Sequence, residues 1–254
     1  MSPIKLPSEV AGLGNVISTH AIHPKRSKQD FVAGAVTAAL GLAVLFCAFS
    51  TLLGGGDGAG FSGGFFLLIA LAILGTAGYT IQSGVQKRDW TVWVCKDGLA
   101  QKLAGKITIM LWKDVCEVLQ NSTRNARTNG VALNSLKVIA EDGSRLDFNG
   151  RLEDSEKLAQ NVQCAAGDYL MKELGDKIHA GEQLSFGKLA LSKQGVVAGR
   201  RIFTWDQIGE VKMSGGVVRI NDLKNNKVVA SGRVAEFPNA FVFVVLASEF
   251  LKKA

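Results

Sequence analysis

Histidine and cysteine, the side chains that most often act as bases, nucleophiles or metal ligands, are sparse in this sequence. The chain has three histidines and four cysteines, at His20, His23, His179, Cys47, Cys95, Cys116 and Cys164. No pair of cysteines has CxxC spacing, and no HExxH or P-loop pattern is present. The sequence therefore predicts no catalytic residue, no metal site and no cofactor, and we expect this protein not to be an enzyme.

Carboxylates gather at one place, Glu153, Asp154 and Glu156, just before a segment with helical periodicity. Acidic side chains are favoured at a helix N-terminus by the helix dipole. We therefore interpret this run as a solvated helix start and not as an acid–base pair.

Basic side chains give the sequence a clearer potential for binding. The net charge is +7, and residues 179–254 carry 11 basic and 6 acidic side chains, against 14 and 13 in residues 82–178. A basic surface tethered to a membrane is attracted to the anionic inner leaflet. The candidates for contact with lipid headgroups are Lys188, Lys193, Arg200 and Arg201. Aromatic and basic residues do not alternate here, so we expect no nucleic-acid partner.

Two apolar segments near the N-terminus are long enough to cross a membrane as helices. Phe31–Leu53 and Phe61–Ile81 each have about the 20 residues that a bilayer core requires, and a glycine-rich link containing Asp57 joins them. Basic residues flank the pair, at Lys25, Arg26, Lys28, Lys87 and Arg88. The positive-inside rule then places both termini in the cytoplasm. We predict a transmembrane hairpin over residues 31–85, preceded by a basic N-terminal cytoplasmic tail over residues 1–30.

Small and aromatic residues suggest how the hairpin packs. Close helix contact is expected at the small residues Gly34, Ala38, Gly41, Gly75 and Gly78. Trp90 and Trp93 follow the second segment, and we expect them at the level of the lipid headgroups.

The region after the hairpin shows an internal repeat. Trp112 and Trp205 each begin the pattern Trp-x-x-(Val/Ile)-x-Glu-Val, and similar landmarks precede and follow both. Each copy has short β-type runs separated by tight-turn dipeptides and ends in one helix. The closing segment Pro238–Lys253 is rich in β-branched and aromatic residues, but we expect a helix there because Pro238 suits a first turn and the first copy ends helically.

Several short strands followed by one helix resemble the pleckstrin-homology-like (PH-like) barrel. Asp97-Gly98-Leu99 followed by Trp112-Lys113-Asp114-Val115 is similar to the pattern of uncharacterised membrane-anchored PH-like proteins. The resemblance implies tandem PH-like β-barrels, each closed by a C-terminal helix, over residues 88–177 and 178–254. In PH-like domains the loop between the first two strands often holds phosphoinositide headgroups, but the usual Lys-x-(Lys/Arg)-x-Arg arrangement is absent from the second copy, so we expect non-specific attraction to the anionic leaflet there.

We therefore expect a transmembrane α-helical hairpin followed by an α+β region, and a membrane-anchored binding or scaffolding protein. The partners are anionic lipids of the inner leaflet or a membrane protein. Two alternatives remain open: a lipid or small-ligand carrier that uses a barrel cavity, and an accessory subunit of a membrane protein complex.

Overall fold

The computed structural model describes residues 6–22, 24–53, 59–87, 89–124 and 131–253. The chain divides into two compact units. A soluble unit comprises Met1–His20, Val92–Gln101 and Ile107–Ala254, and a hairpin unit comprises Ala21–Thr91 with Lys102–Lys106.

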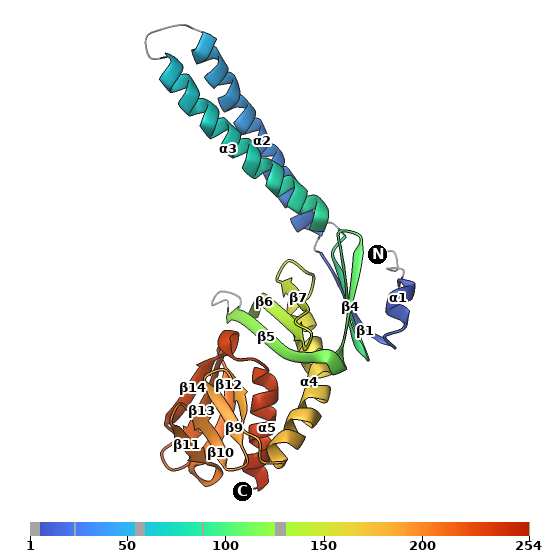
Figure 1. Cartoon of the computed structure of the whole chain (residues 1–254), viewed down its shortest axis with the longest axis vertical. Helices are drawn as coiled ribbons and strands as arrows, with labels where there is room; N and C mark the ends of the chain where they lie inside the picture. The colour runs from blue at the N-terminus through green and yellow to red at the C-terminus, as the bar shows by residue number, and fades with distance from the viewer. Residues whose placement is uncertain (1–5, 23, 54–58, 88, 125–130, 254) are drawn as a thin grey trace. The chain divides into compact units, whose positions relative to one another are not determined.

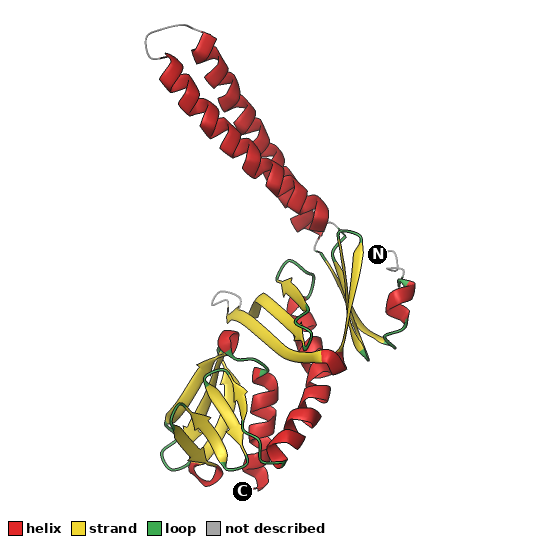
Figure 2. Cartoon of the chain, viewed as in Figure 1, coloured by secondary structure: helices red, strands yellow, loops and turns green. Residues whose placement is uncertain are grey.

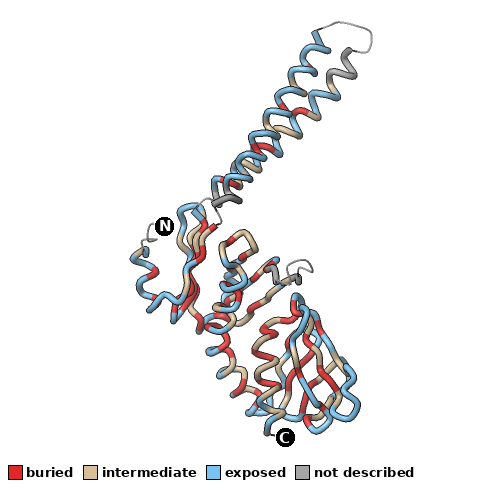
Figure 3. The backbone as a smooth tube through the Cα atoms, turned by 180° about the vertical axis from the view of Figure 1, so that it is seen from behind, coloured by how far each residue is buried: buried red, intermediate tan, exposed pale blue. Residues whose placement is uncertain are grey.

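The hairpin unit contains two long antiparallel helices, α2 (Pro24–Leu53) and α3 (Ala59–Lys87) (Figure 1). Within them, Phe31–Leu53 and Gly64–Val85 are long and apolar enough to cross a membrane. Most of the described residues of these two helices are exposed (Figure 3). The glycine-rich link at residues 54–58 and Arg88 lie outside the described residues.

Small residues at seven-residue spacing bring the two helices together. The buried positions are Gly34, Gly41 and Ala48 on α2, and Ala70, Ala77 and Gly84 on α3. A Cβ on Gly34 would lie 2.6 Å from Ile81 Cγ1, and one on Gly41 would lie 2.9 Å from Leu74. The expected contacts at Gly34 and Gly41 are confirmed. Those at Gly75 and Gly78 are wrong, because both glycines are exposed and nothing lies within 4 Å of a Cβ there.

The first four-stranded sheet begins before the hairpin. Its order is β1-β2-β3-β4, with β1 (Val16–Ala21) and β2 (Thr91–Cys95) as neighbours, followed by β3 (Gly98–Leu103) and β4 (Lys106–Leu111). The hairpin is thus an insertion between two adjacent strands of one sheet. Because β1 and β2 pair, both ends of the hairpin must be on the same side of any membrane that it spans.

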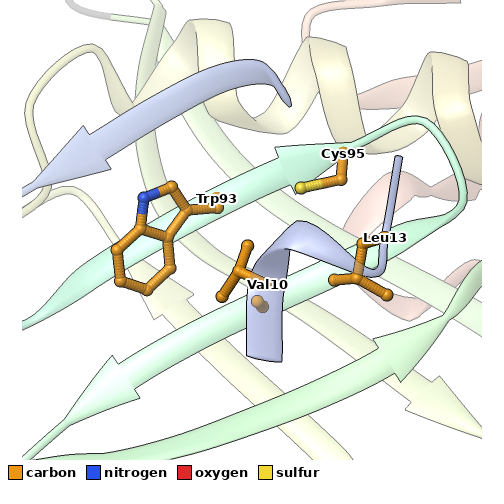
Figure 4. Packing of buried hydrophobic residues seen from close by; sticks show 5 residues of the cluster. Val10, Leu13, Trp93 and Cys95 are labelled. Carbon is orange, nitrogen blue, oxygen red and sulfur yellow. The ribbon is translucent and has the colours of Figure 1, made fainter. Parts of the chain in front are cut away.

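The N-terminal segment also supplies core residues. After the short helix α1 (Ser8–Ala11), Val10 and Leu13 pack with Trp93, Cys95 and Ala100 in one buried cluster (Figure 4). Trp93 is 2 % exposed and Trp90 4 % exposed. The expectation that these two indoles lie among lipid headgroups is wrong, because the protein itself covers them.

The rest of the first half forms a second sheet and a helix. A 3-10 turn, η1 (Trp112–Asp114), leads into the sheet β5-β6-β7. Its strands are Val115–Arg124, Val131–Ala140 and Arg145–Asn149, and α4 (Ser155–His179) follows. Helix α4 packs on η1, β5 and β6.

The second half repeats this order of elements. The sheet β8-β9-β10-β11 comprises Leu184–Phe186, Leu189–Ser192, Gly195–Ala198 and Arg201–Thr204. After η2 (Trp205–Gln207), the sheet β12-β13-β14 comprises Ile208–Ser214, Val217–Asp222 and Val228–Arg233. The 3-10 turn η3 (Val234–Glu236) and helix α5 (Ala240–Lys253) end the chain. The helix expected over this β-rich sequence is confirmed, and it packs on β12 and α4.

The predicted tandem barrels are wrong. The described strands form four separate small antiparallel sheets, and none of these sheets closes into a barrel (Figure 2). The break falls at the tryptophan turns, where η1 and η2 separate the last strand of each four-stranded sheet from the next strand. Each helix therefore covers an open sheet instead of plugging the end of a closed one.

Candidate functional site

The structure separates the four predicted headgroup residues, all of which are exposed. Lys188 lies in the β8–β9 turn, and Arg200 and Arg201 lie at the β10–β11 turn. These two turns are at the same end of the antiparallel sheet, whereas Lys193, in the β9–β10 turn, is at the opposite end. Lys188 Nζ also forms an ion pair with Glu236 Oε2 at 3.1 Å. The four cations therefore do not form one site.

A buried polar cluster that the sequence analysis missed joins β1 to the start of α4. His20, 3 % exposed, places Nδ1 3.0 Å from the carbonyl oxygen of Glu153 and Nε2 2.9 Å from Ser18 Oγ. The carbonyl can only accept, so Nδ1 carries the proton and Nε2 accepts from the serine. Asn161 Nδ2 donates to the same Oγ at 2.8 Å. Burial lowers the pKa of His20, which keeps the ring neutral.

Two of the cysteines are poor nucleophiles. Burial, with a smaller contribution from a nearby carboxylate, raises the pKa of the Cys95 and Cys116 thiols. Both thiols therefore stay protonated at neutral pH.

The most distinctive site geometry lies along β5, an edge strand of its sheet. Val118 donates its backbone N–H to Asn239 Oδ1 at 2.8 Å, and its carbonyl accepts the Asn239 N–H at 2.9 Å. Asn239 Nδ2 donates to the Cys116 carbonyl at 2.8 Å. Asn239 lies immediately before α5. It thus makes, at Val118 alone, the hydrogen bonds that a neighbouring strand would otherwise make with the edge of β5.

Beyond Val118 the edge of β5 is open. In an antiparallel ladder the backbone groups that face one edge recur at every second residue, so the N–H and C=O of Gln120 face the same edge as those of Val118. No described residue hydrogen-bonds to these two groups of Gln120. The Gln120 side chain turns elsewhere, toward Gln163 and Ser122.

A groove of about 380 Å³ runs beside this open edge. The turn between β12 and β13 forms one side, where Gly215 and Gly216 have φ angles of +60° and +75°. A Cβ on Gly216 would lie 3.6 Å from the Ser122 carbonyl oxygen, so this wall faces the β5 edge. The lining residues are Gln120, Asn121, Ser122, Met213, Ser214, Gly215, Gly216, Val217, Arg233, Val234 and Ala235.

The charge of the groove has one sign. Among the lining residues that the structure describes, Arg233 is the one charged residue and none is a carboxylate. Its guanidinium is well exposed and lies 3.9 Å from Glu236 Oε1, at the limit of an ion pair. Met213, Val217 and Val234 supply apolar surface. The arrangement offers backbone hydrogen bonds, an apolar wall and one cation.

A larger concavity, about 550 Å³, lies between η1 and α4. It mixes Lys113 and Lys172 with Asp168, Glu173 and Asp176, so the charges compensate one another. We find no convergent set of groups there that selects a ligand.

Comparison with curated proteins gave no match. Comparison with protein families matched residues 6–253, nearly the whole chain and therefore the hairpin as well as the soluble unit. This protein belongs to the family of unknown function DUF6585.

Proposed function

We propose that this protein is a membrane-anchored binding protein without catalysis of its own, and that its soluble unit holds an extended peptide segment of a partner in the groove beside β5. The hairpin spans the membrane, and both termini and the soluble unit face the cytoplasm. The observation that carries the proposal is the open β5 edge at Gln120, which lies beside the groove and follows, along the same edge, the position at Val118 where Asn239 already takes the place of a strand.

Strand addition fits these contacts. An extended peptide that continues from the position of Asn239 would pair with the free N–H and C=O of Gln120, and main-chain hydrogen bonds would give affinity. Its side chains would alternate between the groove wall and solvent. An unpaired edge is otherwise a liability for aggregation, and a bound segment removes it.

The lining residues define the chemistry of the partner. An acidic side chain would meet Arg233, where a charge-assisted hydrogen bond forms at low cost because the guanidinium is only weakly engaged. An apolar side chain on the same face would meet Met213 and Val217. We therefore propose an extended segment that alternates acidic and apolar residues.

The test is selection from a random peptide library on the full-length protein in nanodiscs. Peptides with an acidic and an apolar side chain two positions apart should be enriched, and Arg233→Glu should abolish their binding. A library that yields no such peptides, or peptides that bind the Arg233→Glu variant as well as the wild type, would refute the proposal.

A matched pair of variants isolates the strand edge. Gln120→Pro removes the outward N–H without disturbing the ladder to β6, since proline is accepted on an edge strand when its nitrogen faces away from the neighbour. Gln120→Ala keeps the N–H and removes the side-chain bonds to Gln163 and Ser122. We expect Gln120→Pro to weaken peptide binding about tenfold, the value of one well-made hydrogen bond, and Gln120→Ala to leave it nearly unchanged.

We also propose that the two halves are copies of one unit. Both have a four-stranded sheet, a 3-10 turn, a three-stranded sheet and a helix in that order. The Trp112 Nε1 group donates to the Cys95 carbonyl at 3.0 Å, and the Trp205 Nε1 group donates to the Lys193 carbonyl at 3.1 Å. A register shift follows each turn, between Val115 and Glu117 and between Ile208 and Glu210.

If the halves are copies, the hairpin was inserted into the first. The β8–β9 connection of the second half is the short turn Gly187-Lys188, whereas the matching β1–β2 connection holds both long helices. The anchor then belongs to one copy, and the second copy supplies the far wall of the groove.

The two alternatives that the sequence left open, a carrier and an accessory subunit, require different structural features. The carrier needed a closed barrel, which the four open sheets do not form. The accessory subunit would recognise its membrane partner through α2 and α3, so replacing the hairpin with an unrelated one should abolish that association but leave peptide binding intact. Lys188, Arg200 and Arg201 stay candidates for lipid contact by the second copy, and Lys193 serves as their control.

A further inference from the structure

The end of the first sheet that carries the hairpin also carries a basic turn. Strand β1 ends at Ala21, shortly before α2, and β2 begins at Thr91, shortly after α3. Antiparallel neighbours reverse direction, so the β1–β2 and β3–β4 connections lie at the same end of the sheet. The β3–β4 turn, Lys102–Lys106, also groups with the helices in the hairpin unit.

The chain leaves little distance between this end and the apolar spans. The span Gly64–Val85 is followed by the last helical residues of α3, which ends at Lys87, and then by three residues before β2. With about 1.5 Å per helical residue and about 3.5 Å per extended residue, Thr91 lies at most about 17 Å from Val85. The headgroup layer is about 5–8 Å deep and the Debye length is about 8 Å. Thr91 therefore lies at most about 9–12 Å outside the headgroup layer, which is well within the Debye length of about 30 Å at 0.01 M salt, so charges at this end of the sheet can act on the headgroups at low salt.

The sequence around this end is rich in basic residues. Residues 24–30, 86–89 and 102–106 together contain seven basic and two acidic residues in the sequence. Lys106 is exposed and Lys102 partly exposed, and neither has an ion-pair partner among the residues that the structure describes. Ala104 and Gly105, between them, have φ angles of +52° and +78°, the geometry of a tight hairpin turn at the tip of the sheet.

The opposite end of the same sheet differs. There the β2–β3 turn carries Lys96 next to Asp97. Both residues are exposed, and their N–H groups donate to the carbonyl oxygens of Asn15 and Leu13 in the N-terminal segment. The β2–β3 turn thus carries one lysine beside one carboxylate, whereas the β3–β4 turn carries two lysines and no carboxylate.

We propose that Lys102 and Lys106 bind the headgroups of anionic lipids in the leaflet that faces the soluble unit, and so hold the β3–β4 turn against the membrane surface. This rests on the proposed membrane span but not on the peptide groove. Attraction of one lysine to an anionic leaflet corresponds to about a fivefold preference. Lipid composition would then control how firmly the first sheet is held at the surface.

The test is lysine footprinting of the full-length wild-type protein with a water-soluble amine-reactive ester, read by mass spectrometry. Nanodiscs of phosphatidylcholine alone are compared with nanodiscs that also contain phosphatidylserine. We expect the modification of Lys102 and Lys106 to slow about fivefold when phosphatidylserine is present at low salt, and to recover at high salt. Lys96, at the other end of the same sheet, should react equally in both.

Equal reactivity of Lys102 and Lys106 in the two kinds of nanodisc would overturn the proposal, as would an equal slowing at Lys96. A chain that sodium carbonate extracts from membranes would refute the span and with it the binding of Lys102 and Lys106 to lipid, but it would not refute peptide binding in the groove. In hydrogen exchange, the backbone amides next to positions 102 and 106 should lose their dependence on phosphatidylserine in the Lys102→Gln, Lys106→Gln double variant. The same variant should still bind the selected peptides. The two proposals can therefore fail separately.

Discussion

Removal of the Asn239 side chain should most clearly weaken the contact between the two halves. Its amide makes two hydrogen bonds to β5, at 2.8 Å each, and the residue is 8 % exposed. Removing the side chain leaves the Val118 N–H and the Cys116 carbonyl without partners, at about 1–3 kcal/mol each. We therefore expect Asn239→Gly to lower the free energy of unfolding by about 2–5 kcal/mol. Asn239→Ala should cost about 1 kcal/mol more, because Asn239 has a φ of +53° that alanine adopts less readily.

Two measurements on the full-length protein in detergent test the contribution of the Asn239 side chain. Denaturant unfolding gives the global loss, and hydrogen exchange at the Val118 amide reports the local one. Asn239→Asp keeps an acceptor for the Val118 N–H but sets a carboxylate against the Cys116 carbonyl, so it should restore protection at Val118 without restoring full stability. An Asn239→Gly protein within about 0.5 kcal/mol of the wild type, with the Val118 amide still protected, would refute the role of Asn239 as a strand substitute.

Other substitutions test the remaining elements. His20 has a pKa below its usual 6.5 because burial disfavours the charged ring. Below about pH 6.5 the unfolded chain therefore binds a proton that the folded chain does not, and the free energy of unfolding should fall as the pH drops. The His20→Gln variant should lose this pH dependence in unfolding scans. Gly41→Leu should splay α2 from α3, whereas Gly78→Leu should be tolerated, as measured by cysteine cross-linking between the helices. Gly98→Ala should destabilise the first sheet by about 2 kcal/mol or more in denaturant titrations, because its Cβ would lie 2.6 Å from the Met110 carbonyl oxygen.

The elements that local periodicity determines could be predicted from the sequence. The hairpin and α4 followed from apolar spacing, helix-start signals and segment length, and α5 followed from Pro238 and from the helix that ends the first copy. The tryptophan pattern could be found in the sequence, but the 3-10 turn at each tryptophan could not. It marks a 3-10 turn that ends one sheet and begins another, so the strands on either side do not continue into a barrel.

The elements that depend on distant partners could not be predicted. Strand β1 is six residues of mixed polarity, and its partner β2 lies beyond the whole hairpin. Nothing in residues 1–30 distinguishes it from a polar tail. The same holds for His20, whose hydrogen-bond partner Glu153 lies far along the chain, and for Asn239, whose role requires β5 of the other half.

The insertion of the hairpin between β1 and β2 leads to a prediction that separates the observed fold from the expected domain boundaries. Ile22 donates its N–H to the Trp90 carbonyl at 3.0 Å, so the ladder of β1 and β2 continues up to these two residues. Replacing residues 23–89 with Asn-Gly should close a tight hairpin there and give a soluble, folded protein.

The matched control is a chain that begins at Trp90, close to the domain start expected from the sequence. It lacks β1 and the buried Val10 and Leu13, whose burial contributes about 1.5–3 kcal/mol each. That loss is a large part of the 5–15 kcal/mol by which a domain is typically stable. We therefore expect the shortened chain to aggregate while the Asn-Gly variant unfolds cooperatively. If the chain from Trp90 folds as stably as the Asn-Gly variant, then β1 is not an integral strand of the first sheet, and the hairpin is an N-terminal anchor and not an insertion.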